Sequence, residues 1–311
     1  MMKKGIVSVI RDLSPLNNRT EMPKWVFVIK KALAFLLCYW AGLLVAEGAV
    51  ILLHFACGKN IFNGEMFEGD ILNFISCFGL VLPIVITLLY WKLIEKKPLP
   101  QMGLTRQFGN YFIGAAAGIV LVTISVIAVM LTGSIRFAGF LESPDIVMIA
   151  VQFGGFIIQG AMEEILCRGL VLHSLKDKTG LPVAVGISTL AFIYPHLSTL
   201  GEFGPVFRAV GILNLALVSL IFSFVTVRFK SLWAACGLHT LWNACLYCVM
   251  GLDLSGGEGS VNAVLDLRTV GESILNGGKY GIESSIVTAA VLAVCAVIMW
   301  YVWLRKPRKL G

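Results

Sequence analysis

The chain has 311 residues, of which 58% are hydrophobic and only 14% are charged, and its formal net charge is +7. Soluble globular chains are about half apolar and about a quarter charged, so this composition excludes an ordinary soluble domain and favours an integral membrane protein. The cations lie in short segments between apolar runs and at both ends, where they orient membrane helices, so we expect no nucleic-acid partner.

Apolar runs long enough to cross a bilayer recur along the whole chain. A run of roughly 20 apolar residues spans a hydrocarbon core of about 30 Å. Such runs cover 32–56, 71–92, 109–132, 146–176, 182–200, 209–227, 232–251 and 284–304. The segment before them is polar and broken by Pro15 and Pro23, so we expect the first run to be an uncleaved anchor. The sequence therefore predicts an all-α fold, a polytopic membrane helical bundle of about eight transmembrane helices.

The positive charges alternate between the two sides of this bundle. Cations, among them Lys30 and Lys31, gather before the first run, in the second, fourth and sixth connections and in the tail. By the positive-inside rule, both termini are cytoplasmic. The stretch "EKKPLPQMGLTRQ" divides an N-terminal part, residues 1–100 with two transmembrane helices, from a core of residues 101–311. Within this core, "GAAAG" at 114–118 has the GxxxG spacing of close helix packing, and residues 252–283 are expected to be an external loop.

Three charges interrupt the apolar segment "GAMEEILCRGL" at 160–170. An ionisable side chain at the bilayer centre costs at least about 2.5 kcal/mol, so these charges need a reason. Glu164 and Arg168 are four residues apart, so on a helix they share a face with the glutamate on the N-terminal side, which predicts an ion pair. Glu163 is rotated by about 100° from Glu164 and is not expected to share the arginine. A carboxylate outside that pair can accept a proton as a general base, whereas the alternative is a helix anchor with Glu163 at the water interface.

Two histidine motifs follow on later apolar runs. In "AFIYPHLS", Phe192 and His196 share a helix face, and Pro195 bends the helix just before the histidine. In "GLHTLWNACL", His239 and Asn243 share a face and offer hydrogen-bond donors that could stabilise an oxyanion. The alternative is structural, because either motif can hydrogen-bond across a helix interface. Neither HExxH nor GxSxG occurs, which excludes these two peptidase signatures.

The residues leave the question of a metal open. One carboxylate and two imidazoles, from Glu163, His196 and His239, make up a donor set that is typical of zinc sites. A glutamate with a histidine can equally activate water without a metal.

Taken together, EExxxR at 163–168, FxxxH at 192–196 and HxxxN at 239–243 resemble the motifs of the CPBP family, the CAAX proteases and bacteriocin-processing enzymes. This group includes the type II CAAX prenyl endopeptidase. The motifs occur in the family's order, each on its own apolar run, and the resemblance covers residues 145–250. It implies an intramembrane endopeptidase, a hydrolase that cuts peptide bonds near the membrane in C-terminal CAAX-type or small peptide substrates.

The resemblance also implies a role for each motif residue. The residues carried over are Glu163, His196, His239 and Asn243 as catalytic residues, and Glu164, Arg168 and Phe192 as supporting residues. Glu163 and His196 would activate the attacking water, and His239 and Asn243 would hold the oxyanion. We expect glutamate catalysis with no cofactor, and zinc bound by Glu163, His196 and His239 as the alternative. The expected partners are membrane lipid and a peptide or lipidated protein substrate, in a bacterial cytoplasmic membrane.

Two other functions are compatible with the sequence. A membrane immunity or scaffold protein without proteolytic activity would keep the motifs as structure. An ion-coupled transporter would use membrane carboxylates as a relay, but it predicts charges spread along a path and internal repeats. Here the unusual residues cluster on three runs, and no repeat is visible.

Overall fold

The computed structural model describes residues 6–67, 69–259 and 262–304. Within these residues, six helices are long and apolar enough to cross a membrane: Lys24–Ala56, Ile75–Ile94, Gly109–Leu131, Ile146–Thr179, Leu181–Gly201 and Pro205–Phe229. A shorter apolar helix covers Ile286–Val302. The predicted class, a polytopic helical membrane protein, is confirmed. The expected run 232–251 is helical as well, as α11 (Trp233–Ala244) followed by η5 (Cys245–Val249).

Contacts between residues divide the chain into two compact units. The first unit comprises Met1–Thr105 and Ala161–Ala191, and the second comprises Arg106–Gly160 and Phe192–Gly311. The chain passes between the units three times: after Thr105, and inside two helices, α6 (Ile146–Glu164) and α8 (Leu181–Ile193). The division at residue 100 that the sequence suggests stays a prediction.

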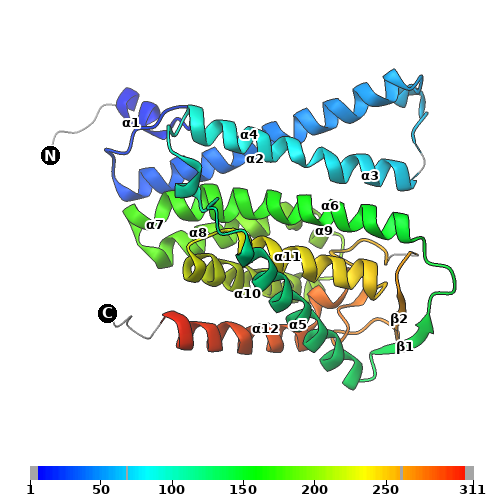
Figure 1. Ribbon diagram of the computed structural model, residues 1–311. Coiled ribbons are helices and arrows are strands. Elements are labelled where there is room, and N and C mark those ends of the chain that lie inside the picture. The colour runs from blue at the N-terminus through cyan, green and yellow to red at the C-terminus, as the bar shows by residue number, and fades with distance from the viewer. Residues whose placement is uncertain (1–5, 68, 260–261, 305–311) are drawn as a thin grey trace. The chain divides into compact units, whose positions relative to one another are not determined.

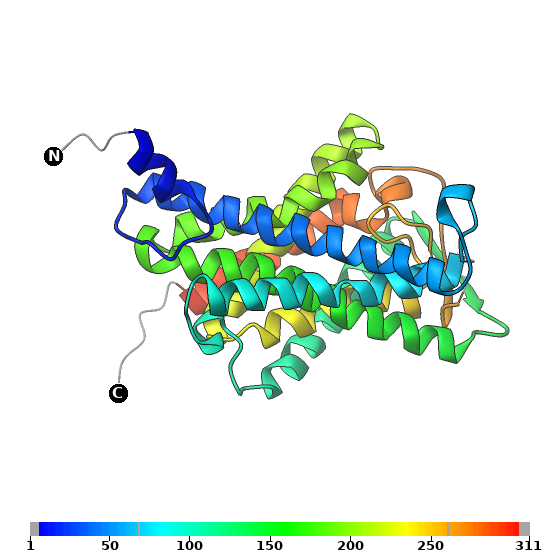
Figure 2. The same cartoon turned by 90° about the horizontal axis from the view of Figure 1, so that it is seen from above.

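The first unit is built around α2 (Lys24–Ala56) and α4 (Val81–Leu93), which lie side by side in Figure 1 and Figure 2. A Cβ atom on Gly42 of α2 would lie 2.6 Å from the Cα atom of Pro83 of α4, so the approach requires glycine. The other elements are α1 (Ile6–Leu13), η1 (Ile61–Asn63), α3 (Gly69–Gly79), η2 (Leu99–Met102), η3 (Ile165–Leu172) and α7 (His173–Thr179), with the end of α6 and most of α8.

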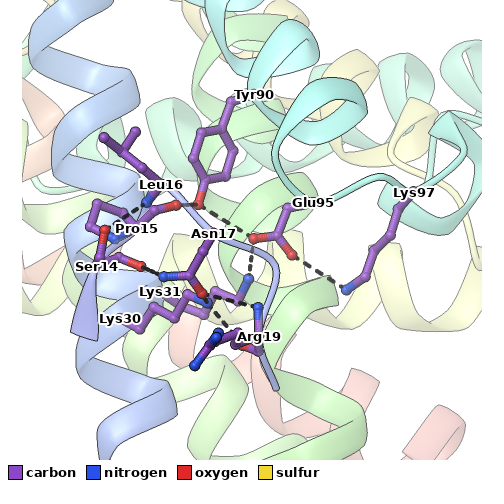
Figure 3. Close-up of polar contacts among 10 residues, drawn as sticks. All are labelled: Ser14, Pro15, Leu16, Asn17, Arg19, Lys30, Lys31, Tyr90, Glu95 and Lys97. Carbon is purple, nitrogen blue, oxygen red and sulfur yellow. Dashed lines mark hydrogen bonds and ion pairs between the residues drawn. The ribbon is translucent and has the colours of Figure 1, made fainter. Parts of the chain in front are cut away.

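Two lysines of α2 are buried in this unit (Figure 3). The Nζ atom of Lys31 lies 2.5 Å from Oε1 of Glu95, and both side chains are almost fully buried. Lys30 donates from Nζ to the side-chain oxygen of Asn17 and to the carbonyl oxygen of Arg19, both at 2.8 Å. Each buried ammonium group needs such acceptors, because an uncompensated charge in a low-dielectric interior is costly.

The position of these lysines differs from the expectation that they lie before the first membrane helix. Helix α2 begins at Lys24, so Lys30 and Lys31 lie within the helix. Their acceptors come from the N-terminal segment and from Glu95, just after α4, which are distant in sequence. Hydropathy along one run cannot reveal acceptors of this kind. The same segment is fastened by Tyr90, whose hydroxyl donates to the carbonyl oxygen of Pro15 at 2.6 Å.

The second unit carries both histidine motifs. Its elements are α5 (Gly109–Leu131), β1 (Ile135–Phe140), most of α6, η4 (Tyr194–His196), α9 (Leu197–Gly201), α10 (Pro205–Phe229), α11, η5, β2 (Leu265–Thr269), η6 (Gly278–Tyr280), η7 (Ile282–Ser284), α12 (Ile286–Met299) and η8 (Trp300–Leu304). Strands β1 and β2 pair antiparallel, with a bulge between Phe137 and Gly139. The segment 252–283, expected as an external loop, therefore includes a paired strand and also the fully buried Tyr280.

Glycines bring α5 into direct contact with α11. A Cβ atom on Gly114 would collide with the carbonyl oxygen of Ala234, and one on Gly118 would lie 2.5 Å from the carbonyl oxygen of Leu238. The close packing that the GxxxG spacing predicts is therefore confirmed. Because α11 carries the HxxxN motif, this contact fixes the position of that motif within the second unit.

Candidate active site

The predicted site residues are divided between the two units. The first unit holds Glu163, Glu164 and Arg168, and the second holds Phe192, His196, His239 and Asn243. Each unit therefore supplies a distinct part of the predicted set: an acidic part with its arginine, and a part with two imidazoles and a carboxamide.

Glu164 and Arg168 form the ion pair that their spacing predicts. Nη1 of Arg168 lies 3.0 Å from Oε1 of Glu164, and both side chains are fully buried. Breaking a buried pair of this kind would leave a charge in a low-dielectric surrounding, so the pair holds both groups in place. Glu163, the preceding residue, is only partly buried. The two neighbouring glutamates are therefore not equivalent, because Glu164 is committed to Arg168 and Glu163 keeps some exposure.

The helix changes its form directly after Glu164. Helix α6 ends there, and residues Ile165–Leu172 continue as the π-helix η3, which contains Arg168. Side chains meet two of its carbonyl groups: the hydroxyl of Ser188 donates to the carbonyl oxygen of Cys167 at 2.8 Å, and Nδ1 of His173 lies 2.7 Å from that of Arg168. Turns of the π type are rare and are frequent at functional sites, so η3 supports this segment as part of a site.

In the second unit, the FxxxH motif lies where a membrane helix tightens. Helix α8 ends at Ile193, and the 3-10 helix η4 carries Pro195 and His196. The bend expected at Pro195 thus takes the form of a tighter helical turn. Nδ1 of His196 lies 2.9 Å from the carbonyl oxygen of Phe192. Because a carbonyl oxygen can only accept, Nδ1 donates here, and Nε2 of the neutral imidazole keeps its lone pair.

The ring of Phe192 links the two histidine motifs. Its centroid lies 5.3 Å from the ring centroid of His196 and 5.9 Å from that of His239. Phe222 of α10 completes the cluster, since it stacks on His239 at 4.8 Å and meets Phe192 edge to face at 5.8 Å. Both phenyl rings are buried. The two imidazoles, which come from different helices, therefore share one aromatic cluster in the second unit.

Helix α11 presents His239 and Asn243 one turn apart, and each is 5% exposed. Between them, Trp242 donates from Nε1 to Oε1 of Glu283 at 3.2 Å. Glu283 in turn accepts from the backbone nitrogen of Ser255 at 2.7 Å and from its hydroxyl at 2.8 Å. Glu283 therefore ties the motif helix to the segment that follows η5. Sequence reasoning missed this residue, although a tryptophan inside the motif was a signal, because a buried indole N–H needs an acceptor.

Helix α6 also meets α11 at the HxxxN motif. A Cβ atom on Gly160 would lie 3.2 Å from Oγ1 of Thr240 and 3.5 Å from Cβ of His239. Contact at the first of these distances is tight, so a larger residue at 160 would press on the motif. Gly160 is the last residue of α6 that belongs to the second unit.

These features define a class: a polytopic helical membrane protein with glutamate, histidine and asparagine motifs on separate apolar helices. Residues 145–245 match a family model described as type II CAAX prenyl endopeptidase Rce1-like, and all three motifs lie inside the match. This segment therefore belongs to the CAAX protease family that the motifs resemble. At the level of the family, this match supports a membrane-embedded hydrolase, an intramembrane endopeptidase of the CAAX type. No curated protein and no solved structure matches the chain.

Proposed function

We propose that this chain hydrolyses peptide bonds by water that Glu163 and His196 activate, while His239 and Asn243 stabilise the oxyanion. The observation that carries the proposal is the contact of Phe192 with both imidazoles, at centroid distances of 5.3 and 5.9 Å. A hydrolytic site needs a group that orients water and a group that binds the developing charge within reach of one carbonyl. An aromatic cluster that gathers the two histidines of separate motifs supports such a site.

The proposed reaction conserves its protons. Glu163 takes a proton from the water as the water oxygen bonds to the peptide carbonyl carbon. The carbonyl oxygen becomes the oxyanion and accepts hydrogen bonds from His239 and Asn243. When the carbon–nitrogen bond breaks, Glu163 returns its proton to the leaving nitrogen. His196 orients the water with Nε2, because its Nδ1 is held at the carbonyl oxygen of Phe192.

Glu163 rather than Glu164 is the proposed base. The carboxylate of Glu164 is fully buried against Arg168, and protonation would discharge one half of that pair. Glu163 is partly buried and keeps exposure to surroundings from which water can come.

The proposed substrates are peptides or lipidated proteins with a CAAX-type C-terminus, and the proposed location is a bacterial cytoplasmic membrane. The family match supports the first point, and the cationic alternation along the sequence supports the second. Zinc is the alternative to unassisted glutamate catalysis, because one carboxylate and two imidazoles are ligands that zinc prefers. The described residues, however, contain no group of three His, Cys, Asp or Glu side chains placed to hold a metal ion. When bound, zinc would polarise the carbonyl and activate water.

The test compares the purified protein with a Glu163→Gln variant, in which the base is lost but the shape is kept. A Glu142→Gln variant, changed at an exposed glutamate of the second unit, is the matched control. Each protein is incubated with prenylated and unprenylated C-terminal peptides and with a mixed peptide library, and the products are read by mass spectrometry. We expect Glu163→Gln to lose at least about a hundredfold in cleavage rate, and the control to keep its rate.

Equal cleavage by Glu163→Gln and the unchanged protein would remove Glu163 from the role of base. Absence of cleavage by the unchanged protein on every peptide would favour the alternative of a membrane immunity or scaffold protein. A proton or ion flux in vesicles that depends on Glu163 would instead support a transporter.

A further inference from the structure

The ribbon formed by β1 and β2 has one apolar face because of its bulge. Two residues three apart on a regular strand point to opposite faces. In β1 the pairing shifts between Phe137 and Gly139, so Phe137 is paired with Leu267 and Phe140 with Leu265. The extra residue, Ala138, brings both phenylalanines to the same face. Their rings meet edge to face, with centroids 5.6 Å apart.

The other face of the ribbon is basic. Arg136 lies directly opposite Arg268, and like charges in such a position destabilise a strand pair in water. Nη2 of Arg268 lies 2.7 Å from Oδ2 of Asp266, and the arginine side chain is 60% exposed while that of the aspartate is 20% exposed. One carboxylate between two guanidinium groups leaves an excess of positive charge on this face.

The apolar face of the ribbon is covered in part and exposed in part. Ile135 and Leu267 are buried and attach the ribbon to the second unit, whereas Phe137 is 51% exposed and Phe140 is 70% exposed. Large apolar residues exposed side by side on a folded protein indicate a surface that contacts something apolar.

The exposed apolar surface continues onto the two membrane helices that flank β1. At the end of α5, Leu131 is 83% exposed, and at the start of α6 Ile146 is 65% and Val147 is 74% exposed. Figure 1 shows the ribbon at these helix ends. Residues 132–134 and 141–145 are the connections, and even fully extended they reach only about 10 Å and 18 Å. The ribbon therefore stays close to the level at which α5 and α6 leave the hydrocarbon.

We propose that this ribbon is an interfacial anchor that binds the phospholipid bilayer. Phe137 and Phe140 insert among the acyl chains next to the ends of α5 and α6, and Arg136 and Arg268 bind phosphate groups of the lipids. Phenylalanine is among the residues found on the apolar face of segments that lie in the membrane interface, and arginines reach from this depth to the headgroups. Lipid phosphate also supplies an anion for the positive charge that Asp266 leaves uncompensated.

The experiment places the photocrosslinking residue p-benzoylphenylalanine at position 140, at position 137 as a second reporter, and at the exposed position 258 as the control. The full-length variants are reconstituted in vesicles of phosphatidylcholine and phosphatidylglycerol and irradiated. Mass spectrometry then identifies lipid adducts on the tryptic peptides. We expect acyl-chain adducts at 137 and 140 at yields at least about tenfold above those at 258.

Lipid adducts at 137 and 140 no more frequent than at 258 would overturn the proposal, and so would crosslinks from 137 and 140 mainly to a second copy of the chain. Both probe positions are already exposed, so the variants are expected to fold. Size-exclusion profiles that match the unchanged protein confirm this before irradiation.

Discussion

The imidazole of His239 stacks on the phenyl ring of Phe222, with centroids 4.8 Å apart and ring planes inclined by 20°. Such ring pairs contribute about 0.5–1.5 kcal/mol beyond their burial, enough to favour one orientation of the imidazole. A donor that stabilises an oxyanion must point at the place where the charge develops. For the proposed reaction, the rate therefore depends on the plane in which the imidazole of His239 is held.

Replacing Phe222 by leucine is expected to lower kcat about tenfold and to change KM little. The variant keeps an apolar side chain but removes the flat surface that holds His239, so a transition-state contact is weakened. Steady-state cleavage of a peptide substrate measures both constants. Phe156→Leu is the control. It removes a ring contact in the same unit, because the ring centroid of Phe156 lies 5.7 Å from that of Tyr247. A similar loss of kcat in both variants would mean that general packing, not the stack, is responsible.

Breaking the buried pair of Glu164 and Arg168 is expected to destabilise the fold more than removing it altogether. Glu164→Gln or Arg168→Met alone leaves a buried charge, so each is expected to lower the free energy of unfolding by about 3–5 kcal/mol. The double variant leaves no such charge and is expected to recover a large part of the loss. Denaturation of the purified proteins in mixed micelles measures these differences. Additive losses in the double variant would contradict a dominant pairing.

Gly114→Ala is expected to lower the free energy of unfolding by about 1–3 kcal/mol, because its Cβ atom would collide with the backbone of α11. Gly48→Ala on α2 is the matched control, because nothing lies within 4 Å of a Cβ atom there. That substitution is expected to be neutral or stabilising by up to about 1 kcal/mol, as alanine favours helix. Thermal unfolding compares the two. Equal effects would show that α5 and α11 are not in tight contact.

Asp253, in the segment after η5, is expected to make the stability of the folded protein depend on pH. Burial raises the pKa of this carboxyl above its ordinary value, against the hydrogen bond that the backbone nitrogen of Gly259 donates to it at 2.8 Å. The folded state thus holds the proton more tightly than the unfolded chain, so ionisation costs stability at pH values above the folded pKa. The cost disappears as the pH falls below the ordinary carboxyl range.

Asp253→Asn keeps an acceptor for Gly259 and removes this cost. The variant is therefore expected to be at least as stable as the unchanged protein at neutral pH, and the advantage is expected to vanish in acid. Melting temperatures over a pH series measure the difference. If the difference in melting temperature in favour of Asp253→Asn grew as the pH fell, the raised pKa of Asp253 would be contradicted.

Peptide cleavage is expected to survive exhaustive chelation, because a glutamate base with oxyanion donors needs no metal. Activity before and after dialysis against a chelator, with elemental analysis of the same samples, measures this. Loss of activity that zinc restores would instead support the alternative site of Glu163, His196 and His239.

Local spacing predicted what a single helix determines. The ion pair of Glu164 with Arg168 follows from a separation of four residues. The small residues at the GxxxG interval predicted that Gly114 packs closely against a helix, although they did not identify α11 as that helix. The shared face of His239 and Asn243 has the same origin. The family of the segment 145–245 was predicted as well, since its motifs are short and keep a fixed order.

Contacts between distant segments could not be predicted in the same way. Phe222 is one apolar residue among many on α10, and nothing in its run indicates that it meets His239. Lys30 and Lys31 read as flanking cations because their acceptors, Asn17 and Glu95, lie outside the run. The pairing of β1 with β2 joins residues more than a hundred positions apart, so alternation within either strand could not reveal the partner. The motifs in the sequence thus name the residues of the proposed site, but a side chain that orients one of them, Phe222, lies outside the motifs.

The π-helix η3 determines in which direction around the helix axis the residues of α7, which follows it directly, point. A π turn takes up more residues than an α turn, and each residue advances an α-helix by about 100° around its axis. The side chains of α7 therefore point in other directions around the axis than they would if α6 continued as an α-helix through these residues. Deleting a single residue between 165 and 172 would hardly shorten the span, yet it would turn His173 and its neighbours towards different surroundings. The length of this segment, and not only its composition, is thus part of the information that the sequence encodes.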